Sequence, residues 1–306
     1  MKIGVDIGGT KCAVVLGDQN GIEKKIKFAT TNYEETMQNI INAIAEIGKG
    51  DTVGISCGGP LDSKKGIIMS PPNLPGWDNV PIVKMLSEKF GVPVFLCNDA
   101  DACALAEWKF GAGKGTKNMI FLTFGTGMGA GLILNGHLYS GAMGMAGEIG
   151  HMRMSAFGPV GYGKSGSFEG FCSGGGIAKL GRLLATEQLQ MGKTLPYCKD
   201  EAELPNITAK LLAEYASKGE ETALAVYRIC GEKLGEGLSV LIDILNPERI
   251  VIGSIFARAE ALLRGPMEKA IRKEAITSSA SICEIVPAAL GEAIGDYAAL
   301  AVAEGI

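Results

Sequence analysis

Two glycine-rich turns carry the residues best suited to chemistry in this sequence. The first is DIGGTK at residues 6–11, which follows the apolar run 3–5. The second is GTGMGAG at residues 125–131, which follows the apolar run 119–124. Glycine lets backbone N–H groups approach an anion closely, because no Cβ stands in the way. Two such turns favour a polyphosphate held from two sides.

Each turn is expected to close a hairpin, because apolar strand residues resume at 13–16 and at 132–134. Neither turn has the spacing of a P-loop or of a dinucleotide-binding turn that opens a helix. A tight structural hairpin would explain the first turn almost as well as phosphate binding. The second turn, with Thr123 and Thr126 beside its glycines, is harder to explain by packing alone.

Asn98 and Asp99 follow the predicted strand 92–97, at the kind of strand end where ligand sites of α/β sheets lie. A carboxylate at this position can accept the proton of a hydroxyl that attacks a phosphate, so Asp99 is a candidate general base. Asn98 would hold a neighbouring hydroxyl. The alternative is helix capping, since a helix is expected over 100–110 and both residue types cap well.

A third group of polar residues lies in the sequence GEIGH at 147–151. Glu148 and His151 are three residues apart and could face one ligand from a helical turn. Glu169 is a further acid in the same polar region. Carboxylates, amides and imidazole suit the fixed hydroxyls of a sugar. For His151 a purely structural hydrogen bond is the competing interpretation.

The elements around these residues alternate between strand and helix. Apolar spacing predicts helices at 33–47, 81–90 and 258–275, a mostly helical segment at 175–246 and a last helix near Gly291. Further strands are expected at 53–57, 250–253 and 282–286. The pattern predicts an α/β protein with mixed sheets, and the glycine-rich stretch 111–115 predicts a domain boundary.

Composition narrows the functional classes. The 306 residues carry a net charge of −4 without a basic run, which argues against nucleic-acid binding. No stretch of 18 apolar residues is present, so no membrane span is expected, and the N-terminus does not resemble a signal peptide. The eight cysteines form no CxxC pair, which favours reduced thiols and a cytoplasmic location.

Together these motifs resemble the ROK family of sugar kinases, over almost the whole chain. The two glycine-rich turns resemble its phosphate motifs, the loop 72–77 (PNLPGW) its sugar loop, and Asn98-Asp99 its catalytic pair. The turn 147–151 resembles its hexose-binding turn, and 250–253 the strand and turn beside adenosine. Leu290-Gly291 and the helix after it resemble the segment that crosses back to the first domain.

The resemblance implies the actin-like, two-domain ATPase fold, with a mixed sheet in each domain and an interdomain cleft. The smaller domain would comprise 1–114 and 291–306, and the larger one 115–290. ATP and Mg²⁺ would be the cofactors, with Asp6 orienting the water shell of the metal. The cofactor contacts implied are Asp6, Gly8, Gly9, Thr10, Lys11, Gly125, Thr126, Gly127, Met128 and Gly253. The substrate contacts implied are Gly59, Asn73, Asn98, Asp99, Glu148, His151 and Glu169.

One stretch departs from the family pattern. Many ROK proteins bind a structural zinc with the histidine and three cysteines that follow it. Here residues 161–169 read GYGKSGSFE, so glycine or serine stands at each cysteine position. A histidine without thiolates cannot complete a four-ligand zinc site, and Cys172 alone does not repair it. We therefore expect no zinc.

The resemblance thus implies an ATP-dependent hexose kinase that phosphorylates the 6-hydroxyl, with Asp99 as the base and glucose as the first choice. N-acetylmannosamine, N-acetylglucosamine, fructose and allose remain open, and a homodimer is expected. Two other classes stay in view: a sugar sensor without catalysis, and a transcriptional regulator. Family repressors carry a DNA-binding segment before the kinase-like part, and the first phosphate strand already begins at Ile3.

Overall fold

The computed structural model describes residues 1–305, which divide into two compact units. Unit 1 comprises Met1–Phe121, Ala130–Gly147 and the chain from Ala288 onward, and unit 2 comprises Leu122–Gly129 and Glu148–Pro287. The chain therefore passes between the units several times. These units are groupings in space, and the domain boundaries given above stay a prediction.

Unit 1 contains a five-stranded sheet in the order β3-β2-β1-β4-β7. The first three strands form an antiparallel meander, whereas β4 pairs parallel with β1 and with β7. The sheet is thus mixed, as the hairpin at residues 6–11 and the later crossovers predict. Its strands are β1 (Lys2–Ile7), β2 (Lys11–Asp18), β3 (Gly21–Ala29), β4 (Val53–Cys57) and β7 (Val94–Asn98).

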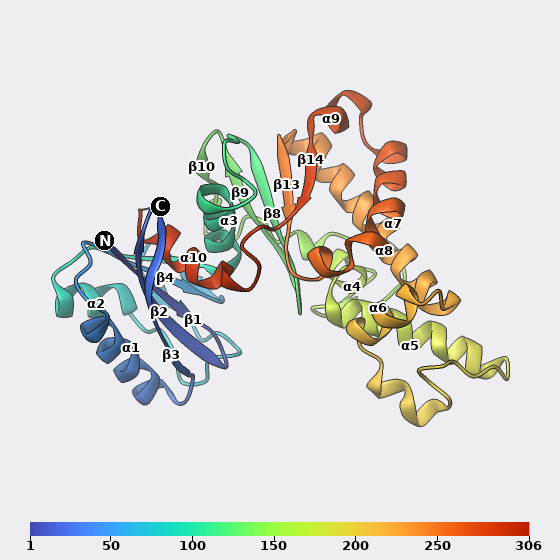
Figure 1. The fold of residues 1–306 in the computed structure, drawn as a ribbon, viewed down its shortest axis with the longest axis horizontal. Helices are drawn as coiled ribbons and strands as arrows, with labels where there is room; N and C mark the ends of the chain where they lie inside the picture. The colour runs from blue at the N-terminus through green and yellow to red at the C-terminus, as the bar shows by residue number, and fades with distance from the viewer. Residues whose placement is uncertain (306) are drawn as a thin grey trace. The chain divides into compact units, whose positions relative to one another are not determined.

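Helices cover both faces of this sheet (Figure 1). Helix α1 (Tyr33–Ile47) packs on β2 and β3, begins at the N-cap Asn32 and ends at Gly48. Helix α10 (Ile294–Val302) packs on β1 and β4 and against α3 (Asp99–Phe110). The approach of α10 is close, because a β-carbon on Gly54 would stand 2.1 Å from the Ala303 nitrogen. The remaining regular elements of this part are α2 (Ile82–Phe90) and the short pair β5 (Leu61–Asp62) and β6 (Ile67–Ile68).

A second five-stranded sheet has the order β10-β9-β8-β13-β14. Strands β8 (Met119–Phe124) and β9 (Met128–Leu134) flank the second glycine-rich turn, as the sequence predicts. Strand β13 (Arg249–Ile252) pairs parallel with β14 (Glu284–Pro287), and β10 (His137–Leu138) pairs antiparallel with β9. The turn therefore lies between two strands of one sheet.

Unit 2 is rich in helix. Helix α7 (Glu221–Leu245) packs along α8 (Ile255–Glu274), and α5 (Gly174–Gln190) and α6 (Ala209–Ser217) pack against α7. Smaller elements complete this part: η1 (Ile149–His151), β11 (Val160–Gly161), β12 (Lys164–Ser165), α4 (Phe168–Phe171), η2 (Glu201–Asn206) and α9 (Thr277–Ile282). In the rest of the chain η3 (Gly291–Ala293) precedes α10.

The expected strand at 282–286 is wrong at its start. Residues 277–282 form helix α9, and β14 begins only at Glu284. Sequence TSSAS has little apolar periodicity, so nothing in it indicated a helix. The Ile282 side chain that suggested a strand is 56 % exposed at the end of this helix.

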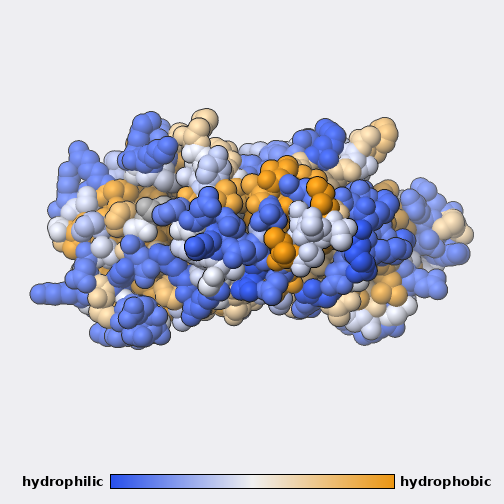
Figure 2. Space-filling view, turned by 90° about the horizontal axis from the view of Figure 1, so that it is seen from above, coloured by the Kyte–Doolittle hydropathy of each residue, from blue (hydrophilic) through white to orange (hydrophobic). Residues whose placement is uncertain are grey.

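The face drawn in Figure 2 is largely hydrophilic, with several smaller apolar areas among the polar residues. Four of the exposed apolar side chains of unit 2 lie on two helices in mutual contact, α7 and α9, and on the residue before α9. They are Val240, Ile244, Ile276 and Ile282. Among residues 1–305, none of the helices has both the length and the apolar character that a membrane crossing requires.

We predict that Gly54→Ala destabilises the protein by about 3 kcal/mol or more, because the added methyl group has no room between β4 and the backbone of α10. The neighbouring change Ile55→Val removes one buried methylene and should cost about 1 kcal/mol. Urea denaturation of both variants measures the two values. Equal losses for the two variants would contradict the close packing of α10.

Candidate functional site

Asn98 and Asp99 lie where β7 ends and α3 begins. The Ala100 N–H donates to Asn98 Oδ1 at 3.0 Å and to Asp99 Oδ1 at 2.8 Å. Both side chains therefore cap helix α3, as the alternative interpretation predicts. Capping also orients the Asp99 carboxylate, since one oxygen is held by the helix. Capping and a catalytic role are thus compatible.

The loop 58–60 lies beside this pair and brings Gly59 to it. A β-carbon on Gly59 would stand 3.3 Å from Asn98 Nδ2, and one on Gly58 would stand 3.7 Å from Asp99 Oδ2. Two glycines in succession therefore leave the polar edge of Asn98 and Asp99 uncovered by side chains on this side. The Gly59-Pro60 peptide bond is cis.

The first glycine-rich turn closes the β1–β2 hairpin, with the Gly8 N–H donating to the Lys11 carbonyl at 3.1 Å. Thr30, the residue after β3, supports it, because its hydroxyl donates to the Gly8 carbonyl at 2.6 Å. Gly9 lies against Asn73, whose Cβ and carbonyl oxygen would be 2.7 and 2.8 Å from a β-carbon there. The structure therefore brings the candidate phosphate turn and the candidate sugar loop together within unit 1.

Asp6 sits in β1 at the edge of a cavity of about 370 Å³. Lys11 and Asp296 line the same cavity, and Lys25 forms a short ion pair with Asp296. Burial is the largest cause that raises the pKa of Asp6 from 3.8 to about 6, and the carboxylates of Asp296 and Asp99 contribute to this rise. The influence of Asp99 indicates that the two candidate acids lie in one electrostatic environment.

In the second turn several backbone amides are already used. The Gly125 N–H donates to the Gly127 carbonyl at 3.1 Å, and the Gly129 N–H donates to Thr123 Oγ1 at 2.8 Å. The Met128 N–H donates to Glu169 Oε2 at 3.1 Å. Glu169, a candidate sugar contact, is thus tied directly to the candidate phosphate turn.

A cavity of about 830 Å³ opens beside this turn in unit 2. Gly125 and Thr126 line it together with Gly174 and Gly175, the first two residues of α5. The α5 N-terminus carries the Ser173 cap and contacts the turn, because the Gly174 N–H donates to the Gly125 carbonyl at 2.8 Å. A helix N-terminus beside a glycine turn favours an anion.

Two cationic side chains line the same cavity, Lys210 from α6 and Arg258 from α8. Arg258 Nη2 donates to Ser254 Oγ at 2.9 Å. Ser254 follows Gly253 and has φ of +53°, which is unusual for a residue with a side chain. Gly253 itself donates to the Leu122 carbonyl at 3.0 Å and so fixes this turn to β8.

Lys210, Arg258 and the α5 N-terminus were not among the candidates from sequence. The run SGGG at 173–176 is a signal that could have found the helix N-terminus. Lys210 and Arg258 stand in ordinary helical patterns 48 positions apart (258 − 210), and nothing in either pattern indicates a cavity.

Glu148 is the N-cap residue of the short helix η1 and His151 is its last residue, and the His151 N–H donates to the Glu148 carbonyl at 3.2 Å. Both side chains are exposed. Gly150 packs on Glu169, whose Cβ is 3.4 Å from the position of a glycine β-carbon. The structure therefore brings the His151 turn next to Glu169 in unit 2.

The donor set expected for zinc does not fit here. Among the described residues no group of three His, Cys, Asp or Glu side chains could hold a metal ion. Cys172 is buried, and its thiol donates to the Cys230 carbonyl at 3.4 Å.

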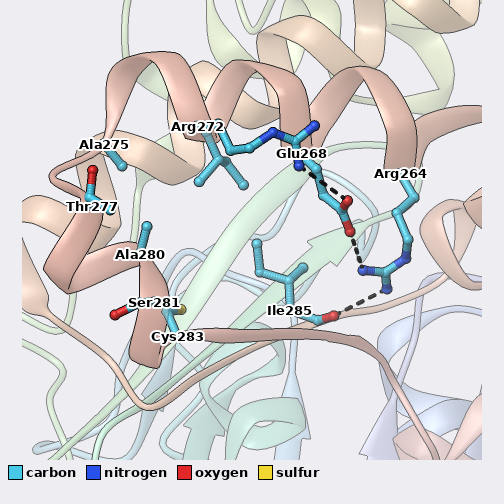
Figure 3. Close-up of a pocket in the computed structure, with 10 residues that line it drawn as sticks. Arg264, Glu268, Arg272, Ala275, Thr277, Ala280, Ser281, Cys283 and Ile285 are labelled. Atoms are coloured by element: carbon cyan, nitrogen blue, oxygen red, sulfur yellow. Dashed lines mark hydrogen bonds and ion pairs between the residues drawn. The ribbon is translucent and has the colours of Figure 1, made fainter.

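A further cavity of unit 2, about 320 Å³, lies between α8, α9 and β14 (Figure 3). It contains none of the candidate residues. Figure 3 shows the Arg264 guanidinium directed at Glu268 and at the Ile285 carbonyl, with Arg272 on the other side of Glu268. Glu260 also pairs with Arg264, so acids offset the cations and the cavity does not select an anion.

Comparison with known proteins shows the family to which this chain belongs. A sequence model of the ROK family matches residues 2–305. The chain belongs to the ROK family. It is 34 % identical over 301 residues to a glucokinase of Thermotoga maritima, covering 96 % of this chain and 94 % of that protein. It is 26 % identical over 303 residues to the xylose repressor of Bacillus subtilis, covering 95 % of this chain and 73 % of the repressor.

The actin-like fold expected from the resemblance is confirmed by solved structures. A ROK family glucokinase from Streptomyces griseus, crystallised with glucose and AMPPNP, is 29 % identical with a TM-score of 0.76, and the match covers 99 % of both chains. The ROK hexokinase from Thermus thermophilus is 26 % identical with a TM-score of 0.81, over 98 % of this chain and 96 % of that one.

We predict that Asp6→Asn stabilises the fold at pH 8 by about 1–3 kcal/mol and leaves it unchanged near pH 4. The folded protein holds the Asp6 proton more tightly than the unfolded chain does, because its pKa is raised from 3.8 to about 6. Stability from this group therefore falls as pH rises from about 4 to 6, and the asparagine avoids that loss. Urea denaturation at the two pH values measures it.

The control for this prediction is Asp51→Asn, whose carboxylate is 88 % exposed. It should change stability by less than about 0.5 kcal/mol at either pH. An Asp6→Asn variant no more stable than the parent at pH 8 would show that the buried charge carries no cost.

Proposed function

We propose that this protein is an ATP-dependent hexose kinase that transfers the γ-phosphoryl group to the 6-hydroxyl of glucose. The observation that carries the proposal is the placement of Asp99. The Asp99 carboxylate is oriented by the α3 N-terminus and faces the glycine loop 58–59. It also lies close enough to Asp6 to raise the pKa of the Asp6 carboxyl. A base and a metal-water ligand placed in this way suit phosphoryl transfer to a hydroxyl.

The nucleotide is assigned to the cavity of about 830 Å³ in unit 2. The N–H groups of Thr126 and Gly127 are assigned to phosphate, since the other amides of that turn donate within the protein. Lys210 and Arg258 supply positive charge, and the α5 N-terminus adds its dipole. Met128 would contribute through the backbone shape of the turn, and Gly253 borders the adenosine.

On unit 1 the terminal phosphates are assigned to Gly8, Gly9 and Thr10, with Lys11 as a further cation. Asp6 fits an indirect contact to Mg²⁺, because its carboxylate stands at the edge of a cavity large enough to hold waters. When bound, the ion would neutralise charge on the phosphates.

The sugar contacts proposed in unit 1 are Gly59, Asn73, Asn98 and Asp99, and those proposed in unit 2 are Glu148, His151 and Glu169. Glucose is preferred because the relatives that are 30–34 % identical over 96 % of this chain are named glucokinases. N-acetylmannosamine, N-acetylglucosamine, fructose and allose are the other substrates to be tested.

In the proposed reaction Asp99 accepts the proton of the 6-hydroxyl as its oxygen attacks the γ-phosphorus, and the β–γ bridging oxygen leaves with ADP. Orientation of Asp99 by the Ala100 N–H lowers the cost of bringing base and hydroxyl into line. Catalysis then consists of positioning and charge stabilisation, as phosphoryl transfer generally requires.

A second candidate is a sugar sensor or regulator without catalysis, because xylose repressors are also among the relatives. The presence of Asp6, Asp99 and both glycine-rich turns favours the kinase. Sugar binding without ADP formation would favour the sensor.

We also propose a cytoplasmic homodimer. All eight cysteines are unpaired, which suits a reducing compartment. The exposed apolar residues on α7 and α9 offer a surface that a second copy could cover. Light scattering of the purified protein measures its mass in solution.

We predict that the protein releases ADP from Mg·ATP when glucose is present, and that Asp99→Asn lowers kcat by about 10²–10⁴-fold. The amide keeps the cap and the shape of the side chain but cannot accept the proton. Glucose affinity should change little, because no ground-state contact is lost. A coupled ADP assay over a panel of hexoses and N-acetylhexosamines, with calorimetry of glucose binding, measures both.

The matched control is Glu88→Gln, an exposed acid with 68 % of its side chain accessible, which should keep full activity. Undiminished turnover in Asp99→Asn would exclude Asp99 as the base. Absence of turnover with every sugar, in parent protein that binds ATP, would exclude the kinase.

A further inference from the structure

Residues 160–165 form a small hairpin at the place where the family pattern has metal-binding cysteines. Strands β11 and β12 pair in the register Val160↔Ser165 and Gly161↔Lys164. The two loop residues, Tyr162 and Gly163, have φ of +42° and +77°. A two-residue loop with both φ values positive is a type I′ turn, which favours Asn or Gly rather than a bulky residue at its first position.

The hairpin contacts the His151 turn at two points. The Lys164 ammonium donates a short hydrogen bond to the His151 carbonyl. The Tyr162 ring lies edge-on to the His151 ring, with centroids 5.2 Å apart and planes at 87°. The Tyr162 side chain is otherwise 83 % exposed, so burial does not account for the aromatic residue in this strained position.

Further bonds anchor the hairpin to the rest of unit 2. Arg153 donates to the Ser165 carbonyl at 2.9 Å, and Lys179 of α5 donates to the Val160 carbonyl at 2.7 Å. Behind the hairpin, the Phe168 N–H donates to the Met152 carbonyl at 2.8 Å. The chain leaving His151 and the chain approaching Glu169 are therefore held side by side without a metal.

We propose that the β11–β12 hairpin is a metal-free brace that positions His151 for the sugar, with Lys164 and Tyr162 as positioning residues. Lys164 holds the backbone of the turn, and Tyr162 sets the plane of the imidazole. The inference rests on the proposed role of His151 in sugar binding. In this chain, side chains of the hairpin would hold the His151 turn in place, a task that bound zinc performs in family members with the cysteines.

Tyr162→Asn is the sharpest variant, because asparagine suits the first position of a type I′ turn and keeps the hairpin intact. If Tyr162 only forms part of the turn, this variant keeps the KM for glucose of the parent protein and is as stable or more stable. If it positions His151, the KM for glucose rises about tenfold while the KM for ATP stays unchanged. Tyr162→Phe keeps the ring and should behave like the parent.

For Lys164 the paired variants are Lys164→Ala and Lys164→Arg. The alanine variant loses the bond to the His151 carbonyl and should raise the KM for glucose about tenfold, and arginine should restore it. Unchanged glucose KM in both Tyr162→Asn and Lys164→Ala, in protein with an active parent, would overturn the inference.

A readout without turnover separates this inference from the proposed function. The chain has only two histidines, so NMR of the imidazole Hε1 protons resolves His151 once His137→Gln has assigned the other signal. The Tyr162 ring should shift the His151 resonance in the parent protein, and Tyr162→Asn should remove that shift. An unchanged His151 resonance would contradict the brace even if the protein were not a kinase.

Metal analysis completes the test. Purified parent protein should contain less than about 0.1 zinc per chain by mass spectrometry, since residues 1–305 contain no set of side chains that could hold a metal ion. The His151 resonance should also survive a zinc-selective chelator. One zinc per chain, lost together with that resonance, would overturn the metal-free brace.

Discussion

Much of unit 1 depends on one buried carboxylate, that of Glu107. Its side chain is fully buried and accepts backbone N–H bonds from Ala112 at 2.7 Å, Leu290 at 2.9 Å and Ala289 at 3.2 Å. A buried carboxylate without such partners would destabilise the fold by several kcal/mol. These bonds fasten the end of α3 to the chain that leads into α10. Because α3 begins at Asp99 and α10 lies on β1, which carries Asp6, Glu107 helps to fix both acids in one frame.

In unit 2 the proposed anion site needs hydrogen-bond donors, and the glycine turn that supplies them must itself be held in place. Three amides of the second glycine turn donate within the protein, and one of these bonds goes to Glu169. The remaining positive potential comes from the α5 N-terminus, Lys210 and Arg258. The bond between the Met128 N–H and Glu169 joins the proposed nucleotide contacts to the proposed sugar contacts. The hairpin at 160–165 then supports the His151 turn from outside this link.

The parts of this arrangement that were predictable from sequence are the local ones. Apolar spacing and the Gly48 stop predict α1 correctly, and the runs around residues 6–11 and 125–131 predict both hairpins, because a strand period or a cap is encoded in neighbouring residues. The glycines of these turns allow close approach, as Gly9 does against Asn73, rather than a positive φ. Lys210, Arg258 and the bonds of Glu107 and Glu169 depend on helices and loops distant in sequence, which no local pattern reveals. Helix α9 was missed because serine-rich segments have weak preferences of their own.

The proposed function requires that this chain transfers a phosphoryl group to a sugar, with Asp99 accepting the proton of the hydroxyl. The most direct measurement is identification of the product by ³¹P and ¹H NMR after the protein has been incubated with glucose and Mg·ATP. The account predicts one new phosphomonoester, coupled to the two protons on C6 of glucose, formed in equal amount to ADP. Release of inorganic phosphate with glucose unchanged, or a phosphate coupled to any other carbon, would contradict it.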